Sequence, residues 1–300
     1  MSQLVVIGGA TATGKSELAL EVAEKIGAEI VNADSMQIYS GMDIGTAKLN
    51  QAERKGITHH LIDVVDPNFD ITVSWYQEQA RKIIDDLIKY KPVVVVGGTG
   101  LYVKAILDDL NFPETNPSVR VDLEKLAEEI GAAQLHQRLA NLDPAAALAI
   151  PAENIRRVIR ALEVIEITGK PFTANLPRAG STKYPEAKLF GLEVERENLD
   201  QRINRRVEKM WGQGFVEEVK TLISATGGMG KTASQAIGYR QIISYLKGEI
   251  SENEAKELTK VATRQYARRQ ETWFKRDERI TWLSPNSNRL ELLLSDILKS

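Results

Sequence analysis

The sequence predicts an α/β fold, in which helices flank the core of a parallel sheet and a mostly helical domain is inserted. Two observations lead to this prediction. Short runs rich in Val and Ile alternate with longer segments of helical periodicity, as strands buried on both faces and separated by helices do. The middle of the chain carries helical patterns only.

The apolar runs are expected to be strands. They occupy residues 4–7, 29–32, 61–65, 93–96, 188–194 and 279–283. Helices are expected over 15–26 and 74–90; in the first, Leu18 and Val22 fall on one face and Gly27 marks the end. Because helices separate the strands, the strands can lie parallel in one sheet.

The domain organisation follows from a change of pattern near Asn111. Residues 112–188 are rich in Ala, Leu and Glu, have helical periodicity and end in a turn-rich linker. We therefore expect a helical insertion domain over 112–188. The core then consists of residues 1–111 and 189–300, and its C-terminal part is helical and basic.

Composition excludes several classes of protein. The 300 residues are 43% hydrophobic and 27% charged, which is typical of globular proteins. Cysteine is absent, which excludes disulfides, thiolate metal sites and cysteine nucleophiles. The apolar runs, such as Val93–Val96, are far shorter than the ~20 residues of a membrane-spanning helix. The N-terminus lacks a signal-peptide pattern, so we expect a cytoplasmic monomer without a membrane partner.

Charge is distributed unevenly. Lys and Arg number 9 against 13 Asp and Glu in the first hundred residues, 12 against 16 in the second, and 18 against 12 in the third. In the third, Lys256, Lys260, Arg264 and Arg268 recur every four residues, which places them on one helix face. Such a stripe suits contacts to a polyanion, although a solvated helix face is equally consistent with it.

A glycine-rich loop at residues 9–16 (GATATGKS) satisfies G-x-x-x-x-G-K-[ST]. It follows an expected strand and opens an expected helix, so its backbone N–H groups surround a phosphate or diphosphate. Lys15 adds positive charge, and the Ser16 hydroxyl is placed for Mg²⁺. The expected diphosphate-binding residues are Gly9, Ala10, Thr11, Ala12, Thr13, Gly14, Lys15 and Ser16. The fold is therefore expected to be P-loop NTPase-like, whereas the similar run at 227–232 lacks the first glycine and is expected to be a plain loop.

Asp34 and Thr99 each follow an expected strand. Because the carboxyl ends of parallel strands share one crevice, both are expected to face the phosphate site. An NTPase usually has an acid where this chain has Gly97 and Gly98. Asp34 is either a carboxylate base or a helix N-cap, and Thr99 is either functional or part of a turn.

Several sequence blocks resemble the tRNA dimethylallyltransferases. The blocks are residues 32–39 (NADSMQIY), 41–48 (GMDIGTAK), 59–67 (HHLIDVVDP), 97–102 (GGTGLY), 157–164 (RVIRALEV) and 236–241 (AIGYRQ). The family's usual motif is GPTASGK; in this chain Ala10 stands where the motif has Pro, and Thr13 stands where it has Ser. Because the eukaryotic members' zinc finger needs cysteines, the bacterial form is the better match.

The resemblance implies transfer of a dimethylallyl group from dimethylallyl diphosphate to N6 of the adenosine 3′-adjacent to the anticodon, in tRNAs that read codons beginning with U. In this chemistry Asp34 would accept the proton of the adenine amine, and Thr99 would lie in the channel by which the adenosine enters. Lys15, Arg160, the loop amides and Mg²⁺ would stabilise the departing diphosphate.

The expected macromolecular partner is a tRNA anticodon stem-loop. By resemblance, the tRNA contacts fall on Asp34, Ser35, Met36, Gln37, Thr99, Arg120, Arg156, Arg157, Val158, Ile159, Arg160, Ile237, Gly238, Tyr239, Arg240 and Gln241. His59 and His60 are expected to be structural. Arg202, Arg205 and Arg206 either assist diphosphate binding or form a solvated helix face.

Three alternative functions compete with this interpretation. A prenyl transferase acting on AMP, ADP or ATP would not need a basic C-terminal third. A small-molecule P-loop kinase would need the strand-end acid that Gly97 and Gly98 replace. An RNA-binding GTPase-like module would need a base-specifying N/T-K-x-D motif, which the sequence lacks.

Overall fold

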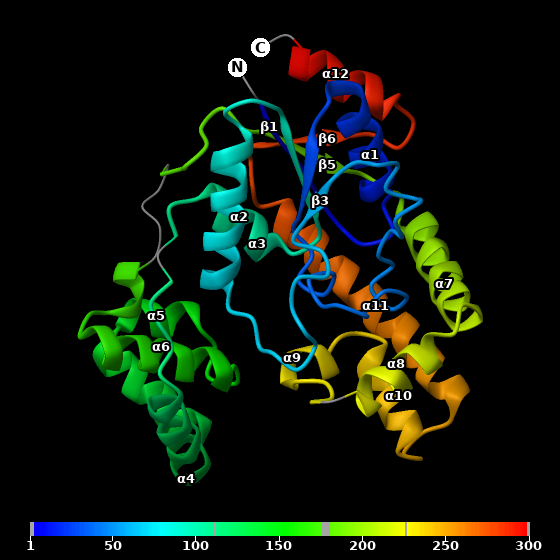
Figure 1. Cartoon of the computed structure of the whole chain (residues 1–300). Helices are drawn as coiled ribbons and strands as arrows, with labels where there is room; N and C mark the ends of the chain where they lie inside the picture. Colours follow the sequence, from blue (N-terminus) through cyan, green and yellow to red (C-terminus); the bar gives the residue numbers. More distant parts are fainter. Residues whose placement is uncertain (1–2, 111, 176–180, 226, 299–300) are drawn as a thin grey trace. The chain divides into compact units, whose positions relative to one another are not determined.

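The structure is a computed structural model that describes residues 3–110, 112–175, 181–225 and 227–298 (Figure 1). It divides into two compact units, one formed by residues 1–106 and 184–300 and the other by residues 107–183. The second unit corresponds to the expected insertion, whose expected limits of 112 and 188 each lie five residues further along the chain.

The first unit contains a six-stranded sheet in the order β3-β2-β4-β1-β5-β6, in which every adjacent pair is parallel. The strands are β1 (Leu4–Gly8), β2 (Glu29–Asn32), β3 (His59–His60), β4 (Val93–Gly97), β5 (Lys188–Leu192) and β6 (Ile280–Leu283). Val5, Ile7 and Val94 are fully buried, as expected of strands covered on both faces. The predicted α/β class and parallel sheet are confirmed.

The expected strand at 61–65 is wrong. The pairing with β2 is made by the two residues of β3, and the chain then turns away. Leu61 and Asp63 both have φ of 58°, in the left-handed region that a strand excludes. The Asn32 side-chain amide donates to the Leu61 carbonyl, and Lys48 pairs with Asp63. These contacts from distant residues stabilise a loop over a locally strand-like pattern.

Helices cover both faces of the sheet. In the first unit they are α1 (Lys15–Ile26), α2 (Val73–Leu87), α3 (Gly100–Leu107), α7 (Arg196–Gly212), α8 (Phe215–Ser224), α9 (Lys231–Ser234), α10 (Tyr239–Leu246), α11 (Glu252–Phe274) and α12 (Arg289–Leu298). α1 and α12 pack on the face that presents Val5, Ile7 and Val94. α2 and α3 lie on the other side of the sheet from α1 (Figure 1). The expected helices at 15–26 and 74–90 are therefore present.

The second unit is helical, as expected. Its helices are α4 (Pro117–Leu142), α5 (Pro144–Ala149), α6 (Ile155–Thr168) and the 3₁₀ turn η1 (Phe172–Asn175). A core of its own contains Leu123, Leu135, Leu139 and Leu162. Gly131, at φ 79° and ψ 164°, interrupts α4.

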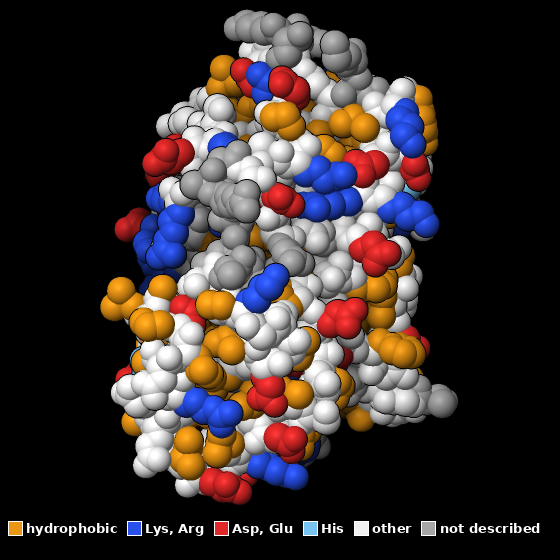
Figure 2. Space-filling view, turned by 90° about the vertical axis from the view of Figure 1, so that its left-hand side faces the viewer, with side chains coloured by type: hydrophobic (Ala, Val, Ile, Leu, Met, Phe, Trp, Pro, Cys, Tyr) orange, Lys and Arg blue, Asp and Glu red, His pale blue; other side chains and the backbone are white. Residues whose placement is uncertain are grey.

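On the molecular face in Figure 2, acidic and basic side chains are interspersed, and exposed hydrophobic side chains occur in small groups. Within the described residues, none of the helices combines the length and the apolar character needed to cross a membrane.

Candidate active site

The phosphate loop joins β1 to α1, in the strand–loop–helix context that the motif requires. Gly9 and Gly14 have φ of 132° and 96°, which glycine tolerates and other residues rarely adopt. The Thr13 hydroxyl donates to the Ala10 carbonyl at 2.9 Å, and Lys15 Nζ donates to the same oxygen at 2.7 Å. The loop is thus held in a closed turn by its own side chains.

Lys15 lies in a cluster of charges. Burial lowers the pKa of its ammonium to about 8, the charge of Asp34 partly opposes this, and the charge of Arg206 adds to it. An ammonium of depressed pKa close to a second cation favours an anionic ligand, because the ligand restores the lost stabilisation of its charge. The electrostatics therefore agree with the diphosphate site predicted from the motif.

Asp34 follows β2 and heads a turn rather than a helix. Its Oδ1 accepts a hydrogen bond from the Met36 backbone N–H at 2.9 Å, and its own N–H donates to Asn32 Oδ1 at 3.0 Å. The N–H of Ser35 donates to Thr99 Oγ1 at 3.0 Å. The strand ends thus bring Asp34 and Thr99 together as predicted, and the helix N-cap interpretation of Asp34 does not apply.

A cavity of about 320 Å³ opens beside Asp34. All of its walls belong to the first unit: the phosphate loop, the turn after β2, residues 45–46, α7, the start of α8, the α9–α10 region and α11. Its polar lining includes Thr11, Asp34, Ser35, Thr46, Arg206, Thr232, Gln235, Tyr239, Thr259, Thr263, Tyr266 and Arg269, with Met36, Met210, Phe215 and Ile237 among its apolar residues. A carboxylate, a guanidinium and an apolar wall therefore meet next to the phosphate loop.

Arg206 is the one of three arginines, left undecided by the sequence, that the structure places in this cavity. Its Nη1 donates to Thr11 Oγ1 at 3.2 Å and its Nη2 to the Thr46 carbonyl at 3.1 Å, whereas Arg202 and Arg205 are exposed. Arg206 lies three residues after the buried Ile203, so helical periodicity alone would have separated it from Arg205.

Glu218 of α8 fixes the segment that carries Thr46, and sequence reasoning missed it. Its carboxylate accepts the backbone N–H groups of three successive residues, Asp43, Ile44 and Gly45, at 2.7–3.2 Å. It also accepts the Tyr239 hydroxyl at 2.7 Å. Burial, together with the Glu218 charge, raises the pKa of Tyr239 above its ordinary range, so this phenol remains a donor.

The predicted tRNA-binding block at 237–241 is partly buried, and its contact with tRNA stays a prediction. Tyr239 and Gln241 are buried, and Gln241 Oε1 accepts the Gly238 N–H at 2.9 Å. The Gln241 side chain therefore stabilises the start of α10. Ile237 and Tyr239 line the cavity, and Arg240 is exposed.

In the second unit, two predicted arginines share one carboxylate. Glu163 is 0% exposed and accepts Arg120 at 2.7 Å and Arg160 at 2.9 Å. Burial alone would raise the pKa of Glu163, but these hydrogen bonds hold it below its ordinary value. Arg160 also donates to the Pro113 carbonyl at 2.7 Å.

The other predicted residues of α6 fall into two groups. Arg156 and Arg157 are exposed. Val158 and Ile159 are buried in the core of the second unit, and the contact of this segment with tRNA stays a prediction. The apolar periodicity of the helix, which buries every third or fourth residue, is the physical reason for their burial.

The basic stripe of α11 is partly neutralised. Glu208 of α7 pairs with Lys256 at 3.2 Å and with Lys260 at 2.6 Å, and Arg264 donates to Asn204. Arg268 and Arg269 remain exposed. The cationic surface that α11 offers is thus concentrated at its C-terminal half, next to the cavity that Arg269 lines.

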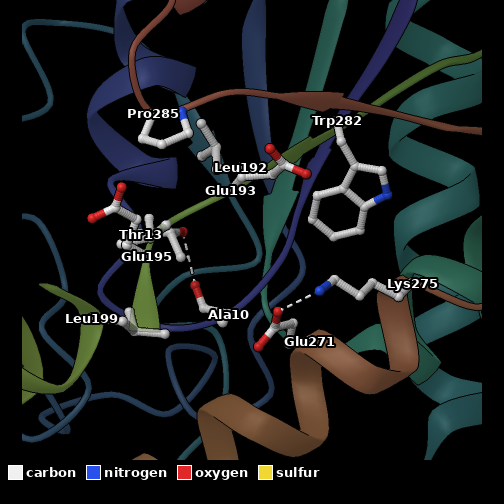
Figure 3. Close-up of a pocket in the computed structure, with 11 residues that line it drawn as sticks. Ala10, Thr13, Leu192, Glu193, Glu195, Leu199, Glu271, Lys275, Trp282 and Pro285 are labelled. Carbon is white, nitrogen blue, oxygen red and sulfur yellow. Dashed lines mark hydrogen bonds and ion pairs between the residues drawn. The ribbon is translucent and has the colours of Figure 1, made fainter. Parts of the chain in front are cut away.

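A second cavity, of about 270 Å³, lies beside the phosphate loop (Figure 3). It is lined by Ala10, Thr13, Leu192, Glu193, Val194, Glu195, Leu199, Glu271, Lys275, Trp282 and Pro285. Lys275 and Glu271 pair with each other at 2.7 Å, and the indole of Trp282 lies opposite Pro285 across the opening. Asp34 and Arg206 belong to the first cavity, so we place the chemistry there.

No group of three or more His, Asp or Glu side chains that could hold a metal ion occurs in the described part of the chain. The oxygen donors available beside Lys15 are the exposed Ser16 hydroxyl, in the first turn of α1, and the Asp34 carboxylate. Hydroxyl and carboxylate oxygens suit Mg²⁺, which keeps several waters and takes further ligands from phosphates. This donor set therefore fits a magnesium ion carried by a bound diphosphate.

Comparisons with known proteins agree with one another. The family described as IPP transferase matches residues 37–277. A tRNA dimethylallyltransferase of Thermobifida fusca is 53% identical over 289 residues, covering 94% of this chain and 90% of the relative. The solved structure of a Bacillus halodurans tRNA isopentenylpyrophosphate transferase is 36% identical with a TM-score of 0.72, covering 100% of this chain and 96% of that one. A eukaryotic dimethylallyltransferase acting on tRNA is 26% identical with a TM-score of 0.83, covering 100% and 80%.

Proposed function

The chain belongs to the IPP transferase family, and on this premise we propose that it transfers a dimethylallyl group from dimethylallyl diphosphate to tRNA. The acceptor is N6 of the adenosine 3′-adjacent to the anticodon, in tRNAs that read codons beginning with U. Family membership confirms the resemblance seen in the sequence blocks. The observation that supports the reaction is the cavity in which Asp34 lies beside Arg206 and Thr11 of the phosphate loop.

Cations and backbone amides of the first unit stabilise the leaving group, which is diphosphate. As the bond between the allylic carbon and oxygen breaks, negative charge grows on the diphosphate, and preorganised donors stabilise it. Lys15 supplies an ammonium, Arg206 a guanidinium and the start of α1 its backbone N–H groups. The Arg160 guanidinium is held by Glu163 within the second unit, so its predicted action on the diphosphate stays a prediction.

The acceptor amine is served by Asp34. The exocyclic nitrogen of adenine is a weak nucleophile, and a positioned carboxylate that takes its proton contributes about 10²–10⁴-fold. One oxygen of Asp34 is fixed by the Met36 N–H, which orients the carboxylate. Thr99, hydrogen-bonded to the Ser35 N–H, holds the same turn in place.

Magnesium would be held by the Ser16 hydroxyl together with diphosphate oxygens. When bound, it would neutralise part of the charge of the leaving diphosphate.

A label-transfer assay tests the proposal. The protein is incubated with Mg²⁺ and radiolabelled dimethylallyl diphosphate, with parallel samples of tRNA, the same tRNA with the target adenosine changed to guanosine, AMP and ATP. We expect label only in the unchanged tRNA. Label in AMP or ATP would assign the chain to the adenylate-modifying enzymes, and consumption of ATP without label transfer would assign it to the kinases.

The affinity for inorganic diphosphate is expected to fall above pH 8. Protonated Lys15 binds the anion, and its pKa without ligand is about 8. The anion raises that pKa, so above pH 8 binding requires uptake of a proton, and the dissociation constant rises by up to about tenfold per pH unit. Calorimetric titration from pH 6.5 to 9.5 measures this. The Lys15→Met variant is the control, because the pH dependence of its diphosphate binding reflects the ionisation of the diphosphate alone. If the dissociation constants of the two proteins changed equally with pH, the decrease could not be assigned to Lys15.

The exposed arginines of α11 are expected to contact tRNA phosphates. Changing Arg268 and Arg269 together to Gln should weaken tRNA binding and reduce the slope of log K against log salt by about 1–2. Binding is measured by fluorescence anisotropy between 50 and 200 mM salt. Lys256→Gln is the matched control, because Glu208 already pairs with that lysine. An unchanged slope in the double variant would return Arg268 and Arg269 to a solvated surface.

A further inference from the structure

Gln270 of α11 joins two segments of the candidate active site. Its Oε1 accepts the backbone N–H of Thr11 at 2.9 Å, and its Nε2 donates to the Gly98 carbonyl at 2.8 Å. The side chain is 5% exposed, so water does not replace either bond. One amide thus connects the phosphate loop, the end of β4 and α11.

The surrounding sequence is adapted to this bridge. A β-carbon on Gly98 would collide with the Gln270 side-chain amide, and one on Gly100 would collide with the indole of Trp273. The glycines after β4 therefore let α11 approach the sheet edge closely. Because the approach is this close, the short Gln270 side chain reaches two backbone groups directly and holds them in one packed arrangement.

Thr11 is held on two sides. Gln270 takes its backbone N–H, and the Arg206 guanidinium donates to its hydroxyl. The conformation of the phosphate loop ahead of Lys15 is therefore set by α7 and α11, which lie about 190–260 residues further along the chain.

We propose that Gln270 is a positioning residue for the transfer reaction, which aligns the phosphate loop with the strand end that carries Thr99. This inference rests on the proposed function. Gln270 contacts no reacting atom; it acts through the Thr11 amide and the Gly98 carbonyl. A displacement of about 1 Å at the loop misplaces the diphosphate relative to the acceptor and costs on the order of 10²-fold in rate.

The pattern of one acceptor and one donor makes a sharp test possible. Gln270→Met removes both bonds at similar size. Gln270→Glu keeps the acceptor for the Thr11 N–H, but an ionised carboxylate has no donor for the Gly98 carbonyl. A protonated carboxyl has one acceptor and one donor, which restores the pattern of the amide, and burial favours that form as the pH falls.

The experiment measures kcat and KM for dimethylallyl diphosphate and for tRNA, with thermal unfolding as a check on folding. At pH 8 we expect both variants to lose about 10–100-fold in kcat/KM for dimethylallyl diphosphate, with tRNA affinity within about twofold. Between pH 8 and pH 6 the Gln270→Glu variant should regain at least about fivefold relative to the wild type. Gln270→Met should keep a constant ratio, and Gln265→Met, on an exposed position of the same helix, should match the wild type.

Other titratable groups do not confuse this comparison. Tyr266 also hydrogen-bonds with Gln270, but burial raises the pKa of its phenol to about 12, so the phenol stays neutral between pH 6 and pH 8. Lys15, whose pKa is about 8, is present in every protein, and Gln270→Met reports its titration without adding a carboxylate. Asp34 and Arg206 also line the cavity and are unchanged in every variant. Wild-type kcat/KM in Gln270→Met, or a pH ratio for Gln270→Glu that stays as flat as that of Gln270→Met, would overturn the proposal.

The outcome is distinguishable from failure of the proposed function. If the wild type transfers no label, binding of inorganic diphosphate by the wild type and the three variants still tests the bridge. Under the proposal, the two Gln270 variants bind inorganic diphosphate more weakly than Gln265→Met. Equal binding by all four proteins would overturn it.

Discussion

Replacing Asp34 by Asn is expected to lower kcat by about 10²–10⁴-fold, while KM for each substrate changes less than about threefold. The asparagine Oδ1 can still accept the Met36 N–H, so the turn after β2 is preserved. What is lost is the capacity to take a proton from the adenine amine. Because the Asp34 charge also raises the pKa of Lys15, the substitution lowers that pKa, and the comparison is made from pH 6 to pH 8 to separate loss of the proton acceptor from loss of the Lys15 charge.

Single-turnover transfer of labelled dimethylallyl to tRNA measures the chemical step in this variant. Asp66→Asn is the matched control, because the Asp66 carboxylate accepts the N–H of Asn68 two residues later in the same manner as Asp34, on an exposed loop. It should transfer at the wild-type rate. If Asp34→Asn lost tRNA affinity and kept its kcat, Asp34 would be a binding residue and the general base would have to be found elsewhere in the cavity.

The parts of the fold that could be read from the sequence are those in which local pattern and tertiary context agree. β2 has the expected bounds, 29–32, because an apolar run there is also a buried central strand. Residues 61–65 look equally strand-like, yet Asn32 and Lys48 hold them in a loop. Asn32 is 29 residues from Leu61 and Lys48 is 15 residues from Asp63, beyond the reach of a periodicity argument.

The residues of the candidate site also fall into those that the sequence pattern predicts and those that only tertiary packing brings there. The phosphate loop is a continuous motif, and Asp34 and Thr99 follow from the rule that parallel strand ends share a crevice. Arg206, Glu218 and Gln270 come from helices late in the chain and enter the site only through packing. For Arg206 helical periodicity gave a signal, since it flanks the buried stripe of α7. For Glu218 and Gln270 the hydrogen bonds that fix the site segments go to backbone groups, which leave no trace in the residue types opposite them.

Replacing Arg206 by Met is expected to lower kcat/KM for dimethylallyl diphosphate by about 10²–10³-fold. The guanidinium donates to Thr11 and to the Thr46 carbonyl inside the cavity, where a cation acts strongly on a departing diphosphate. A second effect follows from the Lys15 pKa. The positive charge of Arg206 lowers that pKa, so its removal raises it, and the loss of diphosphate affinity should begin at a higher pH than about 8.

Two substitutions separate charge from geometry in this prediction. Arg206→Lys keeps a cation but lacks the fork that reaches Thr11 and Thr46 together, so its activity should lie between that of Arg206→Met and the wild type, with the pH limit of diphosphate binding left near 8. Arg205→Met, one residue earlier and exposed, should behave as the wild type. A rise of the pH limit without loss of kcat/KM in Arg206→Met would mean that Arg206 tunes Lys15 alone. Loss of activity without that rise would mean that its contact is with the diphosphate and that its charge does not govern the lysine.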